Sequence, residues 1–259
     1  MELTPKLKEI TEHHDYPLVF VTVSGAHLYG FPSPDSDLDL RGVHLLPLDE
    51  VTGLRQPRET IELMHDPTAA GSTVGLDLDL VTHDLKKFML LMLKKNGYVL
   101  EQLYSPLIVR TSPVHERLKE LGHGCVTRFH VHHYLGFSQN QWKLFSKENP
   151  PRVKPLLYVY HVLLTGIHLM RTGRIEANLL ALNEEFKLPY IDDLVRRKTE
   201  GAEKSRLDDA DLAFHRQEYE RLEMVLKEAG DSSTLPENPS VRDEMNELLV
   251  HVRSQGLSI

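Results

Sequence analysis

The deciding stretch of this chain reads Ser24-Gly-Ala-His-Leu-Tyr-Gly-Phe-Pro-Ser-Pro-Asp-Ser-Asp-Leu-Asp-Leu-Arg-Gly42. The run over residues 18–24 that leads into it is rich in β-branched and aromatic side chains and predicts a buried strand. Gly25 allows the backbone to turn sharply after that strand. Asp37 and Asp39 then stand two positions apart on a second predicted strand over residues 37–46. Their side chains are therefore expected to project from the same face.

These residues supply two halves of a phosphate and metal site. Two neighbouring carboxylates resist ionising together unless a cation neutralises them. Mg²⁺ commonly meets protein through one or two carboxylates while substrate phosphates fill its other positions. The backbone amides at Gly25 and the hydroxyl of Ser24 are placed to cradle such a phosphate. The stretch therefore predicts a site for nucleotidyl transfer.

A second acidic pair follows on a later strand. Residues 60–64 predict a weaker third strand, and residues 66–74 predict a loop. Residues 75–81 read Gly-Leu-Asp-Leu-Asp-Leu-Val, a strict alternation that puts Asp77 and Asp79 on one face of a fourth strand. Spacing alone leaves both carboxylates as candidates to complete the site.

Helical periodicity dominates the rest of the chain. Asp84 is a predicted N-cap for a helix, and a second short helix is expected after Asn96-Gly97. Further helices are predicted over residues 3–14, 128–148, 154–171, 207–228 and 239–253. We expect an α/β (α+β) fold, with a mixed sheet and flanking helices in a catalytic domain over residues 1–115. A helical domain is expected over residues 116–259.

Composition narrows the class of protein. The chain has 259 residues, of which 41% are hydrophobic and 26% charged, as is usual for a globular protein. Cys125 is the only cysteine, so no internal disulfide is possible. No apolar run reaches the roughly 20 residues of a membrane span, and the N-terminus lacks a signal peptide's apolar stretch. We expect a cytoplasmic protein with no membrane partner. The net charge of −8 argues against a nonspecific grip on nucleic acid.

Three groups of residues resemble one known family. They are Tyr29-Gly30 with Ser33-Pro-Asp-Ser-Asp-Leu-Asp39 and Arg41-Gly42, then Asp79 running into Leu85-Lys-Lys-Phe88 and residues 96–103, and finally His133-Tyr-Leu-Gly-Phe137 with Arg171-Thr-Gly173. Together they resemble the nucleotidyltransferase superfamily of DNA polymerase β, and within it the bacterial RNA-repair-associated (RlaP-type) branch. The resemblance covers roughly residues 18–175.

This resemblance implies a nucleotidyltransferase in which Asp37, Asp39 and Asp79 are the catalytic carboxylates and hold two Mg²⁺ ions, with Mn²⁺ as a substitute. Counting back from Leu85 places the third carboxylate at Asp79, with Asp77 at the rim of the site or as a water-mediated partner. The implied substrates are a nucleoside triphosphate and an RNA or tRNA end. The nucleotide-binding candidates around the turn are Ser24, Gly25, Ala26, His27 and Ser36.

One position departs from the family pattern. The superfamily usually has Gly-Ser where this chain has Gly25-Ala26, so a phosphate-binding hydroxyl is missing there. Backbone amides, Ser24 or His27 are expected to serve instead. Two alternatives to RNA modification stay open: nucleotidyl transfer to a protein or small molecule, and an inactive nucleotide-binding module. Only Ala26 supports the inactive module, and the presence of all three carboxylates argues against it.

Basic residues outnumber their acidic neighbours in one part of the sequence. They lie on two predicted helices and the link between them, and are Lys143, Lys147, Arg152, Lys154, Arg171 and Arg174. They form either a solvated helix surface or a surface that binds phosphates of the triphosphate or of RNA. A second basic run, Arg196-Arg197-Lys198, sits among acidic residues and is expected at the surface.

Overall fold

The computed structural model describes residue 7 and residues 11–34, 36–65, 78–200 and 212–257. They form two compact units. The first comprises Met1–Gly25, Asp37–Cys125 and Asn238–Ile259, and the second comprises Ala26–Ser36 and Val126–Glu237. The mixed sheet, flanking helices and C-terminal helical region confirm the expected fold class. The domain boundary expected after residue 115 stays a prediction.

The first unit is built on a five-stranded sheet with strand order β3-β4-β2-β1-β5. Its strands are β1 (Leu18–Val23), β2 (Leu38–His44), β3 (Thr60–His65), β4 (Leu78–Asp84) and β5 (Ile108–Arg110). The central pair β2–β4 is parallel, whereas the other neighbours are antiparallel. The four strands expected from the sequence are therefore present, with β4 described from Leu78 onward.

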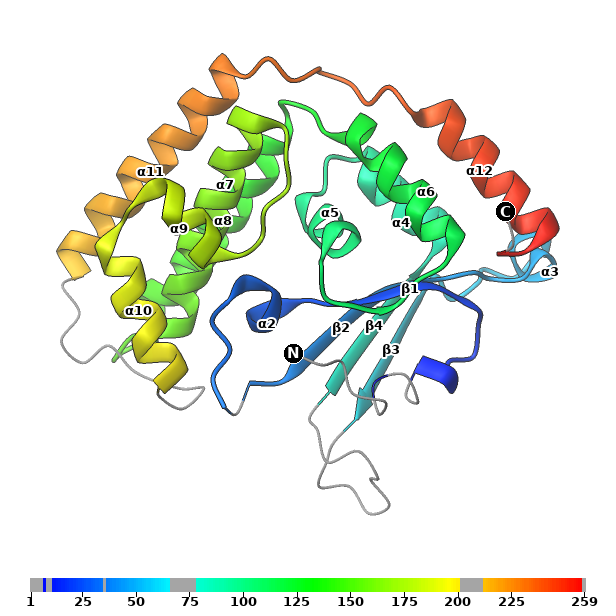
Figure 1. The fold of residues 1–259 in the computed structure, drawn as a ribbon, viewed down its shortest axis with the longest axis horizontal. Helices are drawn as coiled ribbons and strands as arrows, with labels where there is room; N and C mark the ends of the chain where they lie inside the picture. The colour runs from blue at the N-terminus through cyan, green and yellow to red at the C-terminus, as the bar shows by residue number, and fades with distance from the viewer. Residues whose placement is uncertain (1–6, 8–10, 35, 66–77, 201–211, 258–259) are drawn as a thin grey trace. The chain divides into compact units, whose positions relative to one another are not determined.

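Helices cover this sheet and begin at strong caps. Figure 1 shows α4 (Leu85–Leu93), α5 (Gly97–Tyr104) and α6 (Pro113–Gly122) on the same side of the sheet. As the sequence predicts, the Asp84 side chain caps α4 by accepting from the Lys86 amide at 3.0 Å. Asn96 caps α5 in the same way, accepting from the Tyr98 amide at 3.0 Å. These caps fix where each helix leaves the sheet.

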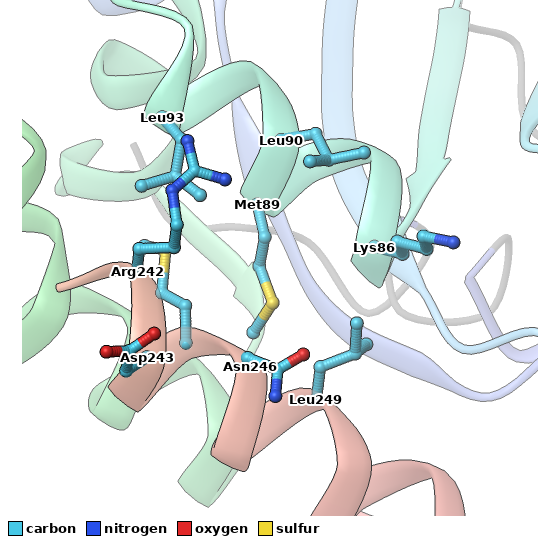
Figure 2. Close-up of a pocket in the computed structure, with 9 residues that line it drawn as sticks. Lys86, Met89, Leu90, Leu93, Arg242, Asp243, Asn246 and Leu249 are labelled. Carbon is cyan, nitrogen blue, oxygen red and sulfur yellow. The ribbon is translucent and has the colours of Figure 1, made fainter.

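The C-terminal helix α12 (Arg242–Gln255) also belongs to the first unit and packs against α4 and α6. Both Nη2 contacts of Arg253 to the Asp84 carboxylate measure 2.7 Å, and the two side chains are 7% and 1% exposed. Between α4 and α12 lies a groove of about 310 Å³, with Met89 and Leu249 on its walls and Arg242 at its rim (Figure 2). None of the expected site residues lines this groove.

The second unit is helical. Its helices are α7 (His130–Lys147), α8 (Val153–Thr172), α9 (Leu179–Phe186), α10 (Pro189–Glu200) and α11 (Leu212–Ser232). Helix α8 contacts all four of the others. By length and composition α8 is able to cross a membrane, but 83% of its most apolar stretch is buried inside the molecule, as in the core helix of a globular unit.

Several elements differ from the sequence expectation. The structure adds β5, α3 (Leu48–Thr52), α6, α9 and α10, and a short helix α2 (Gly25–Tyr29) begins where a turn was predicted. The expected helix over residues 3–14 is described only at Leu7 and from residue 11 onward. The expected loop over residues 66–74 lies outside the described residues.

Candidate active site

Asp39 and Asp79 lie side by side in the sheet. They are register partners in the parallel pair β2–β4, whose strands are neighbours in Figure 1, so their backbones are about 4.8 Å apart. Their side chains are 29% and 36% exposed. The flanking leucines of both strands are buried. The alternation seen in the sequence therefore places both carboxylates on one open face.

Arg41 links the two carboxylates. Its Nη2 donates to Asp39 Oδ1 at 2.8 Å and to Asp79 Oδ2 at 3.0 Å. Its Nη1 donates to the backbone oxygens of Leu40 at 2.8 Å and Asp79 at 2.9 Å. Its Nε donates to the Tyr98 hydroxyl at 3.1 Å. These acceptors occupy all five N–H donors of the guanidinium.

The surroundings keep Arg41 charged. Its side chain is 14% exposed, and this burial alone would lower its pKa. Electrostatic interactions with Tyr98, Asp39 and Asp79 and the hydrogen bond to Tyr98 together outweigh burial and raise the pKa of Arg41 above its ordinary value. Arg41 is thus a permanent positive charge between two carboxylates.

Gly25 is required by the position of Asp39. Its φ is +60°, and a Cβ at this position would lie 2.0 Å from Asp39 Oδ2. The preceding Ser24 amide donates to the backbone oxygen of Asp39 at 2.8 Å, which ties the end of β1 to β2. Ser24 is fully buried, and its hydroxyl finds no hydrogen-bond partner among the described residues. The turn expected to bind phosphate therefore packs directly against a carboxylate expected to bind metal.

The other expected carboxylates are placed differently. Asp37 stands directly before β2 with an exposed side chain. In the part of the chain that the structure describes, no three His, Cys, Asp or Glu side chains gather closely enough to share a metal ion. Asp77 lies outside the described residues. The structure thus brings Asp39 and Asp79 together, whereas a metal-binding role for Asp37 stays a prediction.

The carboxylate pair has the chemistry that a hard divalent cation needs. Arg41 takes one oxygen of each carboxylate, leaving Asp39 Oδ2 and Asp79 Oδ1 without a hydrogen bond from any described residue. Oxygen ligands of this kind suit Mg²⁺ or Mn²⁺. Asp39 and Asp79 would therefore hold such an ion.

The remaining nucleotide-binding candidates, Ala26, His27 and Ser36, belong to the second unit. Ala26 is buried and His27 half-buried, both in α2. Ser36 closes a turn in which its amide donates to the Ser33 backbone oxygen at 3.0 Å. The Ser36 hydroxyl accepts from the Ser33 amide at 2.9 Å. Ser36 is thus part of a hydrogen-bonded turn immediately before Asp37.

Lys198, a residue of α10, is hydrogen-bonded to the turn of Ser33 and Ser36. Its Nζ donates to the Ser33 hydroxyl, and it lies 3.5 Å from the Ser36 hydroxyl. The expectation that the Arg196-Arg197-Lys198 run is surface is wrong for Lys198, which is 0% exposed. Lys198 follows Ile191 and Leu194 by seven and four positions, so it shares their buried helix face.

The sequence analysis gave no structural role to three residues whose side chains hold these turns and strands together. They are Arg41, Tyr98 and Lys198. Arg41 carried a usable signal, because it follows Asp39 by two positions and so projects from the same strand face. Tyr98 and Lys198 act through contacts with residues far away in the sequence, which no local pattern reveals.

The basic residues do not form a single patch. Lys143, Lys147, Arg171 and Arg174 are exposed, whereas Arg152 is paired with Glu148. Lys154 and Arg171 both lie on α8, and at 1.5 Å per residue they are about 25 Å apart along its axis. The Arg171 guanidinium lies 5.8 Å from the ring centre of Phe186. The two ends of α8 therefore carry separate basic groups.

Comparison with known proteins shows the family of the chain. The family model for the RNA repair pathway DNA polymerase beta family, RlaP, matches residues 2–251. The chain belongs to the RlaP family. An uncharacterized protein of Methanocaldococcus jannaschii, MJ0002, is 28% identical over 86% of this chain and 88% of its own length. The uncharacterized protein YcgL of Bacillus subtilis is 25% identical over 95% of this chain and 93% of its own length.

The family match therefore extends well beyond the motif around Asp37 and Asp39 and includes the whole second unit. It relates the chain to nucleotidyltransferases of the polymerase β type. Neither relative has a described activity from which a substrate follows.

Proposed function

We propose that the protein is a Mg²⁺-dependent nucleotidyltransferase that moves a nucleoside monophosphate from a nucleoside triphosphate to an acceptor hydroxyl. The observation that carries this proposal is the side-by-side placement of Asp39 and Asp79 beside the Gly25 turn. The proposed acceptor is an RNA or tRNA end, in keeping with the family description. The cytoplasm, which supplies triphosphates and RNA ends, is the proposed location.

The proposed division of labour follows from where the residues stand. Asp39, together with Asp37, would hold metal on the triphosphate side, and Asp79 would complete the acceptor side. Magnesium, when bound, supplies charge neutralisation for the attacking and leaving oxygens. The acceptor oxygen forms a bond to the α-phosphorus, its proton passes to solvent, and the bond to the bridging oxygen of pyrophosphate breaks. The backbone amides at Gly25 would orient the phosphates.

A second acceptor class is also supported by one observation. The net charge of −8 repels RNA over most of the surface, which favours a protein or small-molecule acceptor. The exposed Lys143 and Lys147 at the end of α7 favour RNA instead, because they offer a local positive surface. RNA remains our proposal because the family description points the same way.

The test is direct. The purified chain is incubated with each α-labelled nucleoside triphosphate, MgCl₂, and either total RNA or total protein, and the label is followed into each acceptor. We expect transfer to RNA, loss of transfer with EDTA, and loss in the Asp39→Asn variant. Leu54→Ala is a suitable control, since Leu54 is a fully exposed side chain away from the pair. Absence of label in every acceptor would refute the proposal, and label in protein alone would replace the acceptor.

A further inference from the structure

The guanidinium of Arg41 is fixed more completely than any other charged group at the carboxylate pair. It connects β2, β4 and α5, because its acceptors come from Leu40, Asp79 and Tyr98 as well as Asp39. With all five donors engaged and 14% of the side chain exposed, Arg41 has no donor left for a substrate. Arg41 must therefore act on the site through the residues that accept its hydrogen bonds.

We propose that Arg41 is a positioning residue and a built-in countercharge, which reduces the net charge of the Asp39–Asp79 pair to −1 and leaves one oxygen of each carboxylate to bind metal. This inference rests on the proposed function, because it concerns the same metal site. It adds a determinant of how tightly, and in what geometry, the two strands bind metal.

Two consequences of Arg41 act in opposite directions. Its positive charge repels a cation at the free carboxylate oxygens, so its removal should tighten metal binding. Its planar fork holds both carboxylates in one arrangement, so its removal should also loosen the geometry needed for transfer. Charge acts over the whole distance between the guanidinium and the cation, and it is little screened at a half-buried site. We therefore expect the charge effect to decide affinity and the geometric effect to decide turnover.

The experiment measures Mn²⁺ binding to the full-length chain by electron paramagnetic resonance, without nucleotide or acceptor, alongside turnover with Mg²⁺. Arg41→Met should bind Mn²⁺ at least tenfold more tightly than the natural chain while its turnover falls at least a hundredfold. Arg41→Lys keeps the charge but has three donors from one nitrogen. It should bind Mn²⁺ within about threefold of the natural chain and still lose most turnover.

A double variant tests the charge count. Asp79→Asn in the Arg41→Met background returns the pair to a net charge of −1. Its Mn²⁺ affinity should fall back toward that of the natural chain, with no recovery of turnover. Circular dichroism establishes that each variant is folded. If Arg41→Met does not fold, the Mn²⁺ affinity and turnover of Arg41→Lys decide the result.

The outcomes separate this inference from the proposed function. If Asp39→Asn abolishes Mn²⁺ binding but Arg41→Met also weakens it, Arg41 is no countercharge and the inference falls while the metal site stands. If Arg41→Lys has full turnover, the fork has no positioning role and the inference is equally refuted. If the natural chain and Asp39→Asn bind Mn²⁺ alike, the metal site itself is refuted and the proposed function fails with it.

Discussion

Replacing Gly25 by alanine should disrupt the site through a contact that the structure makes measurable. At φ +60° a residue with a Cβ adopts the left-handed conformation, which costs about 1–2 kcal/mol. The new Cβ would also lie 2.0 Å from Asp39 Oδ2, closer than any stable contact, so the carboxylate must move. Displacing it breaks the 2.8 Å bond from Arg41, a charge-assisted hydrogen bond whose loss costs about 1.5–3 kcal/mol. We expect Gly25→Ala to lower the free energy of unfolding by about 2.5–5 kcal/mol.

The chain offers a matched control in Gly256. Its φ is +85°, and a Cβ there would meet no atom within 4 Å. Its ψ is −166°, a backbone region that residues other than glycine rarely adopt, so Gly256→Ala should cost only the conformational part, about 1–3 kcal/mol. Urea unfolding followed by circular dichroism measures both values, and Mg²⁺-dependent turnover is expected to fall in Gly25→Ala and to be unchanged in Gly256→Ala.

A double-mutant cycle isolates the contact with Asp39. In the Asp39→Ala background the oxygen at 2.0 Å from the new Cβ is gone and the Asp39 Cβ position at 3.2 Å is the nearest one left, so Gly25→Ala should cost clearly less than in the natural chain. Equal costs of the two glycine substitutions in the natural chain would refute the reasoning. An undiminished cost of Gly25→Ala in the Asp39→Ala background would refute it as well.

Three further predictions follow from the carboxylates, a buried histidine and the basic surface. Asp79→Ala should lose several orders of magnitude in turnover and Asp77→Ala much less, and the reverse ranking in a transfer assay would show that the other carboxylate contacts the metal. Burial lowers the pKa of His115 from 6.5 to about 4, so the unfolded chain takes up this proton first. The stability that His115 contributes is present above pH 6.5 and is lost as pH falls toward 4, a change of about 3 kcal/mol. In His115→Gln, the free energy of unfolding measured in urea should therefore vary less with pH over that range. Replacing Lys143 and Lys147 by glutamine should raise KM for RNA and reduce the salt dependence of binding by about two phosphate contacts, whereas unchanged values in a salt titration would place the RNA elsewhere.

Local features of the fold were predictable because they depend on neighbours in the sequence. A continuous run of β-branched and aromatic side chains identified β1, and alternating apolar side chains identified β2 and β4. The short polar side chains of Asp84 and Asn96 marked the starts of α4 and α5. The sequence also contained a signal for α6 that the periodicity analysis missed. Ser112 accepts from the His115 amide at 3.3 Å, and Pro113 follows at the first helical position.

Helix α10 was missed for a different reason. Its basic and acidic residues suggested a solvated surface, although Ile191, Leu194 and Val195 form a buried face. Lys198 continues that face, and its ammonium group is accommodated because the Ser33 hydroxyl, 165 positions earlier, accepts from it. A buried lysine is tolerable only with such partners. The partner was not visible from the sequence around Lys198.

Alternation in the sequence could not decide between Asp77 and Asp79 as the partner of Asp39. A slip of β4 by one residue would turn both carboxylates to the other face and expose Leu78 and Leu80, which are 1% exposed, so core packing excludes it. A slip by two residues keeps every side chain on its own face, so alternation cannot exclude it. The contacts of Arg41 do distinguish the two registers, because its Nη1 and Nη2 bond the backbone oxygen and the carboxylate of Asp79 at once. Arg41, which reduces the charge of the pair, therefore also favours Asp79 as the partner of Asp39. This is why its replacement should disturb the geometry of the pair even where metal affinity rises.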